Sequence, residues 1–442
     1  MPKKFISFLG TNDYLDCIYY INDADKNNPP LKYVQEYAAS KFAPEWDEND
    51  SILIFTTQKA YNLNWEDNGH YDRKEGNRIP NKGLCQRLKS IDSSAKVKNI
   101  MIPEGYSEAE IWEIFEKVYN ELETGDEIIF DITHAFRSIP MLAIVILNYS
   151  KILKNISLSG IYYGAMETIG FASEVAKIEP DKRLVPVFDL TPFDNLLEWS
   201  SAIERFTEAG DAGKINRLAS QTLIPLLKQA KGKDKNLTAL SSLAKGLDKF
   251  SKNIRTNRKA KGSIADSANS IKERLKVLAD ENIIPAFKPL FRHIEHSVSD
   301  YSDDRIQNGF ASVKWCMDHG LVQQAYTMLL ELIYTKMIVI TPKDPSYLEN
   351  RELASNAFHY VTNKKTDKKS WKEKSLKNEE FTQLMIDFCL KYGKEFTQKG
   401  NLIQQNRNDL NHASDTRSAE SIIKELNDLY EYFKRIFLEA DE

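Results

Sequence analysis

The sequence Glu127-Ile-Ile-Phe-Asp131 runs directly into Ile132-Thr-His-Ala-Phe-Arg-Ser-Ile-Pro140 and then into an almost wholly apolar stretch that ends at Lys154. The first five residues are typical of a central β-strand that is covered on both faces. Proline is tolerated in the first turn of a helix, so residues 140–154 are predicted to form a buried helix that begins at Pro140. A central strand followed at once by an apolar helix is the repeating unit of an α/β domain.

The same pattern extends to both sides of this stretch. Ser107 and Glu110 form a capping-box pattern that starts an amphipathic helix, which ends before Gly125. Strands that alternate with helices predict a doubly wound, Rossmann-like α/β domain over residues 1–190, with a mostly parallel sheet. The other predicted strands are residues 4–9, 17–21, 51–57, 97–102, 158–163 and 185–190.

The pattern changes after Pro192, because residues 191–442 show helical periodicity and few strand-like runs. An all-helical region is therefore predicted to follow the α/β domain. Residues 230–310 are rich in Lys, Ala, Ser and Asn and are interpreted as a helical insertion or linker, and residues 312–442 as an all-α core. Predicted helices of this core are residues 322–339, about 378–396 and about 417–438.

The composition is that of an ordinary globular protein, with 42% hydrophobic residues, 28% charged residues and a formal net charge of −4. This charge argues against a protein that coats nucleic acid over its whole surface, although it allows a local basic groove. The four cysteines are far apart, which favours reduced thiols in a cytoplasmic protein. No apolar run is long enough to cross a bilayer or to form a signal peptide, so we expect no membrane association.

The turn between the central strand and its helix carries polar groups that suit an anion. The backbone N–H groups at the helix start and the hydroxyls of Thr133 and Ser138 could bind phosphate oxygens. Arg137 could pair with a phosphate, and His134 could bond a base or a phosphate. In the alternative interpretation Arg137 pairs with Asp131 for structural reasons and His134 is an ordinary surface residue. So many polar groups at one strand-to-helix turn favour ligand binding.

A second loop, after the first predicted strand, is expected at the same edge of the sheet, where ligands of open α/β domains bind. Gly10 lets the backbone approach a ligand, Thr11 and Asn12 offer hydrogen bonds, and Tyr14 offers a ring for stacking. Gln58, just after another strand, is a further candidate contact. The alternatives are a plain tight turn for the loop and a helix-capping role for Gln58.

The C-terminal stretch Arg407-Asn-Asp-Leu-Asn-His412 holds two side chains that could cleave RNA without a metal. His412 can exchange a proton near neutral pH, and Arg407 can stabilise charge on a phosphate. A helix that begins near Asn408 would place Asn408 and His412 on one face and Arg407 at its mouth. Glu331 could orient the motif or belong to a solvated helix face. An Arg-to-His spacing of this kind would arise by chance in about a quarter of such chains, so its surroundings must decide.

No metal site is predicted, since His293 and His296 lie three residues apart without a clear set of further ligands. They are interpreted as solvent-facing or satisfied within the core. Two basic stretches, residues 252–261 and 364–374, could collect single-stranded RNA, although such runs are usually solvated surface.

Several of these stretches carry a resemblance to one family. The sequences Phe-Leu-Gly-Thr-Asn-Asp-Tyr, Phe-Asp-Ile-Thr-His-Ala-Phe-Arg-Ser-Ile-Pro and Ile-Tyr-Tyr-Gly-Ala resemble the sensor domain of CRISPR-associated CARF–HEPN ribonucleases. Residues 319–327 and the Arg-x4-His motif resemble the helical HEPN domain of the same family. The matching positions are residues 8–14, 130–140, 161–165, 319–327 and 407–412.

This resemblance implies a CARF domain that binds a cyclic oligoadenylate across a homodimer, and cyclic tetra-adenylate is expected because it is frequent in the family. It also implies that two HEPN domains combine Arg407, Asn408 and His412 from each chain into one metal-independent endoribonuclease site. The expected activity is cleavage of single-stranded RNA in type III CRISPR antiviral defence, with 2′,3′-cyclic phosphate products and no cofactor. In this interpretation the bound ligand activates the ribonuclease allosterically.

Two other functions stay open from the sequence. The protein could be a ligand-responsive regulator that binds nucleic acid without cleaving it, although no helix-turn-helix pattern is evident. It could also be a sensor that degrades its own cyclic ligand, with Thr11, Asn12 or His134 taking part.

Overall fold

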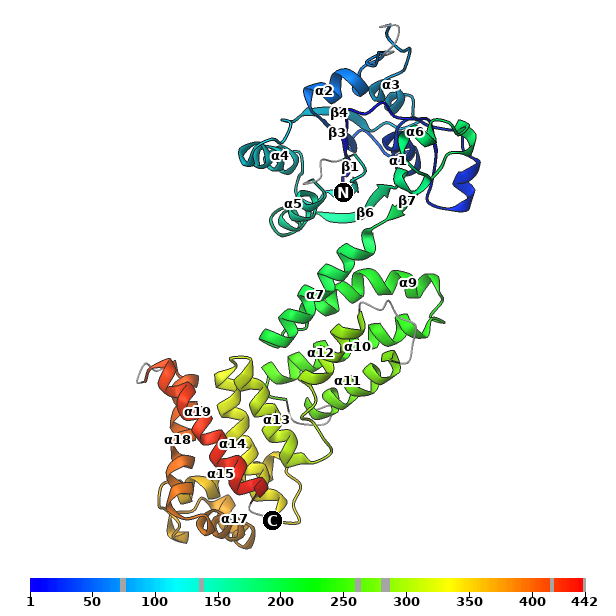
Figure 1. The fold of residues 1–442 in the computed structure, drawn as a ribbon. Coiled ribbons are helices and arrows are strands. Elements are labelled where there is room, and N and C mark those ends of the chain that lie inside the picture. Colours follow the sequence, from blue (N-terminus) through cyan, green and yellow to red (C-terminus); the bar gives the residue numbers. More distant parts are fainter. Residues whose placement is uncertain (72–76, 135–138, 259–263, 280–286, 414–416, 440–442) are drawn as a thin grey trace. The chain divides into compact units, whose positions relative to one another are not determined.

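The computed structural model describes residues 1–71, 77–134, 139–258, 264–279, 287–413 and 417–439 (Figure 1). The chain divides into two compact units, Met1–Asn195 and Leu196–Glu442. In the described residues the first unit is an α/β fold and the second is helical, as the loss of strand-like patterns near residue 190 predicts.

The sheet of the first unit has seven strands in the order β2-β7-β6-β5-β1-β3-β4. All neighbouring pairs are parallel except β6 and β7, which are antiparallel. The prediction of a mostly parallel sheet is therefore confirmed. The strands are β1 (Lys3–Leu9), β2 (Ile18–Tyr20), β3 (Ser51–Thr56), β4 (Lys96–Met101), β5 (Glu127–Asp131), β6 (Ser157–Gly164) and β7 (Leu184–Asp189).

Helices cover both faces of this sheet, which explains why its central strands are apolar without alternation. On one face Ile6 and Phe130 pack against α4 (Glu108–Asn120) and α5 (Ile139–Lys154). On the other face Phe5 packs with residues of α1 (Val34–Phe42) and α3 (Leu84–Lys89) (Figure 1). Two short helices, α2 (Gln58–Ala60) and α6 (Ala172–Val175), complete the unit.

The helix predicted to be buried, α5, is covered on one side only. Ala143, Ile146 and Leu147 are buried against the sheet. Its outer side is apolar and exposed, because this helix carries apolar residues around most of its circumference. The exposed residues are Met141, Ile144, Val145, Tyr149, Ile152 and Leu153.

The second unit is built from helices around one large core. Its first helix, α7 (Thr191–Ala209), starts in the α/β unit. The region interpreted as an insertion or linker forms regular helices, and their buried residues, such as Leu247 and Ile271, belong to the core of the whole unit. The remaining helices are α8 (Gly213–Leu218), α9 (Ile224–Gln229), α10 (Lys235–Arg255), α11 (Ile264–Ala279), α12 (Phe287–Ser297), α13 (Arg305–Asp318), α14 (Val322–Val339), α15 (Leu348–Thr362), α16 (Glu373–Lys377), α17 (Glu379–Lys391), α18 (Gly393–Asn411) and α19 (Ala419–Lys434).

The expectation that a helix begins near Asn408 is wrong, because the Arg407–His412 stretch lies at the C-terminal end of α18. Gly393 has a φ of +76°, which favours glycine and separates α17 from α18. No proline follows before residue 412, and α18 continues to Asn411. Gly400 in its middle accepts the ring of Phe358, whose Cζ would lie 2.6 Å from an added Cβ.

Candidate functional site

The loop after β1 folds onto the turn after β5 at the carboxyl edge of the sheet. The rings of Tyr14 and His134 pack with their centroids 4.3 Å apart, and Tyr14 also meets Tyr33 edge-on at 5.6 Å. Gly10 permits this arrangement, since an added Cβ would lie 2.5 Å from the Tyr14 hydroxyl oxygen. The structure thus brings together three of the predicted ligand-binding residues, Gly10, Tyr14 and His134.

Two polar atoms of this cluster, Oη of Tyr14 and Nε2 of His134, are buried without a hydrogen-bond partner among the described residues. Burial raises the pKa of Tyr14 well above its usual value and lowers the pKa of His134 to about 4, so both are neutral at pH 7. Each buried, unsatisfied group costs about 1–3 kcal/mol, which a bound ligand or water can recover. The predicted residues Arg137 and Ser138 lie outside the described residues.

Asp131 ends β5 and is buried between its neighbours. Its carboxylate accepts hydrogen bonds from Ser7 Oγ at 2.6 Å, from the Thr133 backbone N–H at 3.1 Å and from Thr133 Oγ1 at 2.5 Å. Burial raises the pKa of Asp131 despite these bonds. Thr133 Oγ1 also accepts from the Gly164 N–H at 2.8 Å. The hydroxyl predicted to bind a ligand therefore links the ends of β5 and β6.

Asn64, which the sequence did not single out, holds the first loop in place. Its Nδ2 donates to the carbonyl oxygens of Gly10 and Asn12, both at 2.9 Å, and the residue is fully buried. Its Oδ1 lies 3.0 Å from Nε2 of His70. Sequence patterns could not reveal this role, because the two carbonyl groups that Asn64 binds are distant along the chain.

The other predicted contacts at this edge are more open. Asn12 and Gln58 are exposed, and Thr11 is half-buried. Gln58 Nε2 donates to Asn62 Oδ1 at 2.9 Å, whereas the cap of α2 is Thr57, whose Oγ1 accepts from a backbone N–H. The capping alternative considered for Gln58 is therefore wrong.

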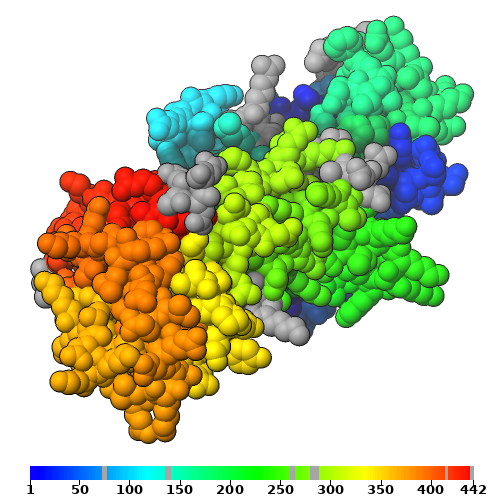
Figure 2. All heavy atoms as spheres, turned by 90° about the horizontal axis from the view of Figure 1, so that it is seen from below, coloured from blue at the N-terminus to red at the C-terminus, as the bar shows by residue number. Residues whose placement is uncertain are grey.

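The Arg-x4-His motif lies at the C-terminal end of α18, and His412 is the C-cap of this helix. The His412 N–H donates to the Asn408 carbonyl at 3.0 Å, so the two residues share one helix face, as their spacing predicts. Both side chains are exposed, and Arg407 Nη1 donates to Asn408 Oδ1 at 3.2 Å. Arg407 Nε is buried without a partner among the described residues. In the space-filling view α18 and α19, orange and red, lie side by side at the surface of the helical unit (Figure 2).

Glu331, considered as a possible orienting residue for this motif, forms an ion pair with Arg351 instead. Arg351 also donates to the Glu331 carbonyl at 3.1 Å and to Thr335 Oγ1 at 3.3 Å. These bonds join α14 and α15 and involve no residue of the motif.

The two basic stretches are partly neutralised in the described residues. Several of their cations have carboxylate partners, which reduces the charge that each surface offers to RNA. These pairs are Lys252–Asp248, Arg255–Asp211, Lys368–Glu379 and Lys374–Glu352.

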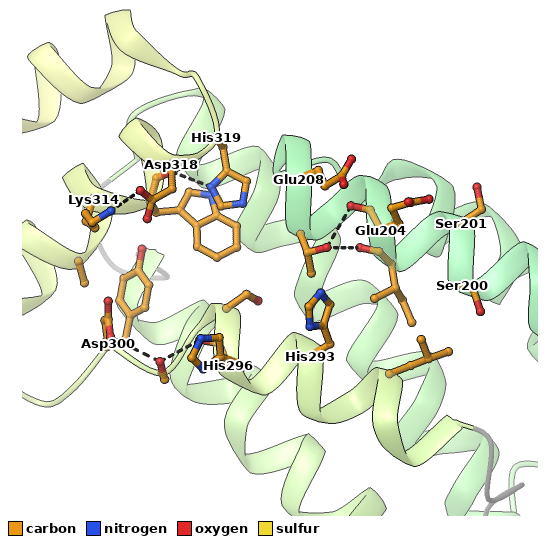
Figure 3. Close-up of a pocket in the computed structure, with 18 of the residues that line it drawn as sticks. Ser200, Ser201, Glu204, Glu208, His293, His296, Asp300, Lys314, Asp318 and His319 are labelled. Atoms are coloured by element: carbon orange, nitrogen blue, oxygen red, sulfur yellow. Dashed lines mark hydrogen bonds and ion pairs between the residues drawn. The ribbon is translucent and has the colours of Figure 1, made fainter. Parts of the chain in front are cut away.

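A cavity of about 760 Å³ lies between α7, α12 and α13, and no predicted ligand-binding or catalytic residue lines it. His293 and His296 of α12 and His319 after α13 project toward it (Figure 3). The His319 ring stacks on Trp315 with centroids 4.0 Å apart, and its Nδ1 lies 2.7 Å from the Trp315 carbonyl oxygen. In the part of the chain that the structure describes, no group of three or more His, Cys, Asp or Glu side chains could hold a metal ion.

Among the described residues, none of the helices combines the length and apolar character needed to cross a bilayer.

No protein-family model matches the chain. A curated relative does. The chain is similar to a CRISPR-associated protein. This relative is CRISPR-associated protein MJ1674 of Methanocaldococcus jannaschii, which is 27% identical over 326 residues. The match covers 72% of this chain and 46% of the relative, so the chain spans less than half the length of that protein.

Proposed function

We propose that the protein is a cyclic-oligoadenylate-activated, metal-independent endoribonuclease that cleaves single-stranded RNA in CRISPR-linked antiviral defence. The α/β unit would be a CARF sensor and the helical unit a HEPN ribonuclease, working as a homodimer. The similarity to a CRISPR-associated protein supports the CRISPR link.

The observation that carries this proposal is the geometry at the end of α18. Arg407 and Asn408 lie near the C-terminal end of α18 and His412 is its C-cap, with Asn408 and His412 exposed to a substrate. Arg407 Nε is a buried donor without an acceptor among the described residues, and a phosphate oxygen is the acceptor that a guanidinium binds best.

The chemistry requires one proton to leave the ribose 2′-hydroxyl as its oxygen attacks the phosphorus, and one proton to reach the departing 5′-oxygen. One His412 can serve as base or acid, but a single chain supplies only one such group. Two copies related by a two-fold axis would supply both, together with two Arg407 side chains that stabilise the charge on the phosphate. The products would carry 2′,3′-cyclic phosphate and 5′-hydroxyl ends.

The outer side of α5 supports the proposal of a homodimer. Its six exposed apolar residues include Met141 at 75% and Ile152 at 82% exposure, and such a stripe is typical of an interaction surface. The Lys151 and Lys154 side chains turn away from this stripe, toward Asp194 and the Leu122 carbonyl. A second copy could cover the stripe, and a symmetric ring-shaped ligand would then meet the same loops twice.

The cluster at the sheet edge supports a nucleotide ligand for the sensor. The Tyr14 hydroxyl and His134 Nε2 have no hydrogen-bond partner among the described residues, and α5 begins at Ile139, a few residues after His134. Adenine offers both donors and acceptors to such groups, and its phosphates would lie at the start of a helix.

The test is RNA cleavage in EDTA by the wild type and His412→Ala, each with and without cyclic tetra- and hexa-adenylate. We expect cleavage by the wild type with one of the two rings, and none by the variant. Cleavage that survives the His412 change would refute the site, and cleavage that no oligoadenylate alters would refute the sensor.

A second activity, degradation of the cyclic ligand by the sensor, is favoured by one observation. His134 is neutral at pH 7, and its Nε2, which has no hydrogen-bond partner among the described residues, could take part in proton transfer. Incubation with labelled cyclic tetra-adenylate would reveal linear products, and their formation by His134→Phe at the wild-type rate would exclude this role. A regulator that binds without cleavage is the outcome if neither RNA nor ligand is cut.

A further inference from the structure

The residue before the motif, Asn406, is completely buried although its side chain is polar. Its Nδ2 donates two hydrogen bonds, one to Tyr326 Oη at 2.9 Å and one to Glu425 Oε2 at 2.7 Å. Its Oδ1 has no partner among the described residues, so the two N–H groups account for the amide's bonds.

The two acceptors belong to different helices. Tyr326 lies on α14 and is itself fully buried, and its hydroxyl donates to the Ile422 carbonyl of α19 at 2.8 Å. Burial raises the pKa of Tyr326 to about 12, so this hydroxyl stays protonated at neutral pH. Asn406 on α18 and Ile422 on α19 are therefore joined through one buried tyrosine.

Glu425 on α19 is held in turn by Arg417, whose Nη1 donates to both carboxylate oxygens, at 2.8 and 2.5 Å. The carboxylate also accepts from Ser421 Oγ at 3.4 Å. The Asn406 amide thus meets an oxygen whose position is already fixed, and a charge-assisted hydrogen bond of this kind is stronger than a neutral one.

We infer that Asn406 is a positioning residue that sets the direction of the last turn of α18, and with it the aim of Arg407, Asn408 and His412. The inference rests on the proposed ribonuclease function. Asn406 is adjacent to Arg407, and its amide bonds both α14 and α19 from the buried side of α18, whereas Gln323 of α14 donates to Asn411 Oδ1 at 2.8 Å on the exposed side. Asn408 and His412 are exposed, so the buried support for this end of the helix comes from the Asn406 side.

The side-chain type follows from the geometry. Two N–H donors on one short side chain are needed to serve two acceptors on two helices, and among side chains of this size only the Asn amide provides them. An Asp of the same shape would lose both donors and place a second carboxylate next to Glu425. Two facing carboxylates cannot both ionise readily, so one of them would keep its proton up to a higher pH than an isolated carboxyl.

The test variant is Asn406→Asp in the full chain, with single-stranded RNA and the activating oligoadenylate. We expect kcat to fall by about 10- to 100-fold with little change in KM, the size of loss that a small misplacement of catalytic groups causes. The loss should be larger at pH 8 than at pH 6, because a shared proton at low pH restores a bridging hydrogen bond to Glu425. A role in stability alone would lower the melting temperature without this pH-dependent loss of kcat.

The matched control is Gln405→Glu, the same amide-to-acid change at the exposed neighbouring position. It should leave kcat and its pH profile near those of the wild type. If Asn406→Asp does not fold, Tyr326→Phe is the second variant. It removes the hydroxyl that accepts from Asn406, keeps the buried ring and leaves the Asn406–Glu425 bond. We therefore expect a smaller fall in kcat, of about tenfold.

A second readout separates this inference from the proposed function. Hydrogen exchange of the His412 amide, which is bonded to the Asn408 carbonyl, should become faster in Asn406→Asp but not in Gln405→Glu. If the wild type cuts no RNA and exchange of the His412 amide is still faster in Asn406→Asp, Asn406 positions this stretch of the helix and the ribonuclease proposal is refuted. Unchanged exchange and unchanged kcat in an active enzyme would overturn the positioning role.

Discussion

The sheet edge of the α/β unit and the C-terminal end of α18 both carry the polar groups that the proposed function assigns to phosphate-bearing ligands, but these groups are buried at one place and mostly exposed at the other. At the sheet edge, Tyr14 and His134 pack on each other and their free polar atoms are buried. On α18, Asn408 and His412 are exposed and only Arg407 Nε is buried. Under the proposed function, the sheet edge of each chain would supply half of the site for the cyclic oligoadenylate. Under the same proposal, the exposed motif would need a second copy of the chain to complete the site and exclude water.

The largest expected effect is on the exposed side of this comparison. His412→Ala should reduce RNA cleavage by about 10³-fold, since one positioned proton-transfer group contributes about 10²- to 10⁴-fold. RNA binding should persist, because Arg407 remains. Cleavage rates and filter binding in EDTA would measure both, with His296→Ala as the control that removes another exposed histidine. Equal losses in the two variants would contradict the assignment.

The next effect concerns acid sensitivity at the sheet edge. Burial lowers the pKa of His134 to about 4 in the folded chain, below the ordinary value near 6.5. The contribution of this residue to the free energy of unfolding is therefore largest above pH 6.5. As the pH falls from 6.5 to 4, the unfolded chain takes up a proton that the folded one refuses, and up to about 3 kcal/mol of stability is lost. Urea unfolding at several pH values should show this loss, and His134→Phe, which keeps the ring packing, should reduce it. An identical acid dependence in both proteins would contradict the buried neutral imidazole.

Removal of the Asn64 amide should have an intermediate effect. Asn64→Ala leaves the Gly10 and Asn12 carbonyls without their donor, which should lower the free energy of unfolding by about 2 kcal/mol and weaken oligoadenylate binding. Calorimetric binding and urea unfolding would test it. Asn62→Ala, at an exposed position of the same segment, is the control. Equal effects of the two changes would show that the Asn64 amide does not hold the loop after β1.

The smallest effect is expected for Tyr14→Phe, which removes one buried hydroxyl that has no hydrogen-bond partner among the described residues. Stability should stay the same or rise slightly, because the unsatisfied hydroxyl is lost. Affinity for the cyclic oligoadenylate should fall by about tenfold if the ligand bonds this hydroxyl. Isothermal titration of the two proteins makes the comparison, and equal affinities would mean that the ring of Tyr14, rather than its hydroxyl, meets the ligand.

Prediction from the sequence succeeded where one element is decided by its own residues. The apolar strand at 127–131, the helix at 322–339 and the Ser107 cap all appear in the structure as expected. Prediction failed where contacts with residues distant along the chain decide the structure. The start of α18 was placed too late, because Gly393 and the fit of Gly400 against Phe358 set that helix. Glu331 was linked to the motif although its ion-pair partner lies on α15.

The sequence by itself determined the order of the elements, the change from α/β to helical structure near residue 190, and the i, i+4 relation of Asn408 and His412. These follow from local periodicity, which each segment carries within itself. Only the tertiary structure decided that Tyr14 packs on His134, that Thr133 links two strands, and that Asn406 ties three helices together beneath the motif. The partners in those contacts come from distant segments, and burial, which removes competing water, gives such hydrogen bonds their effect.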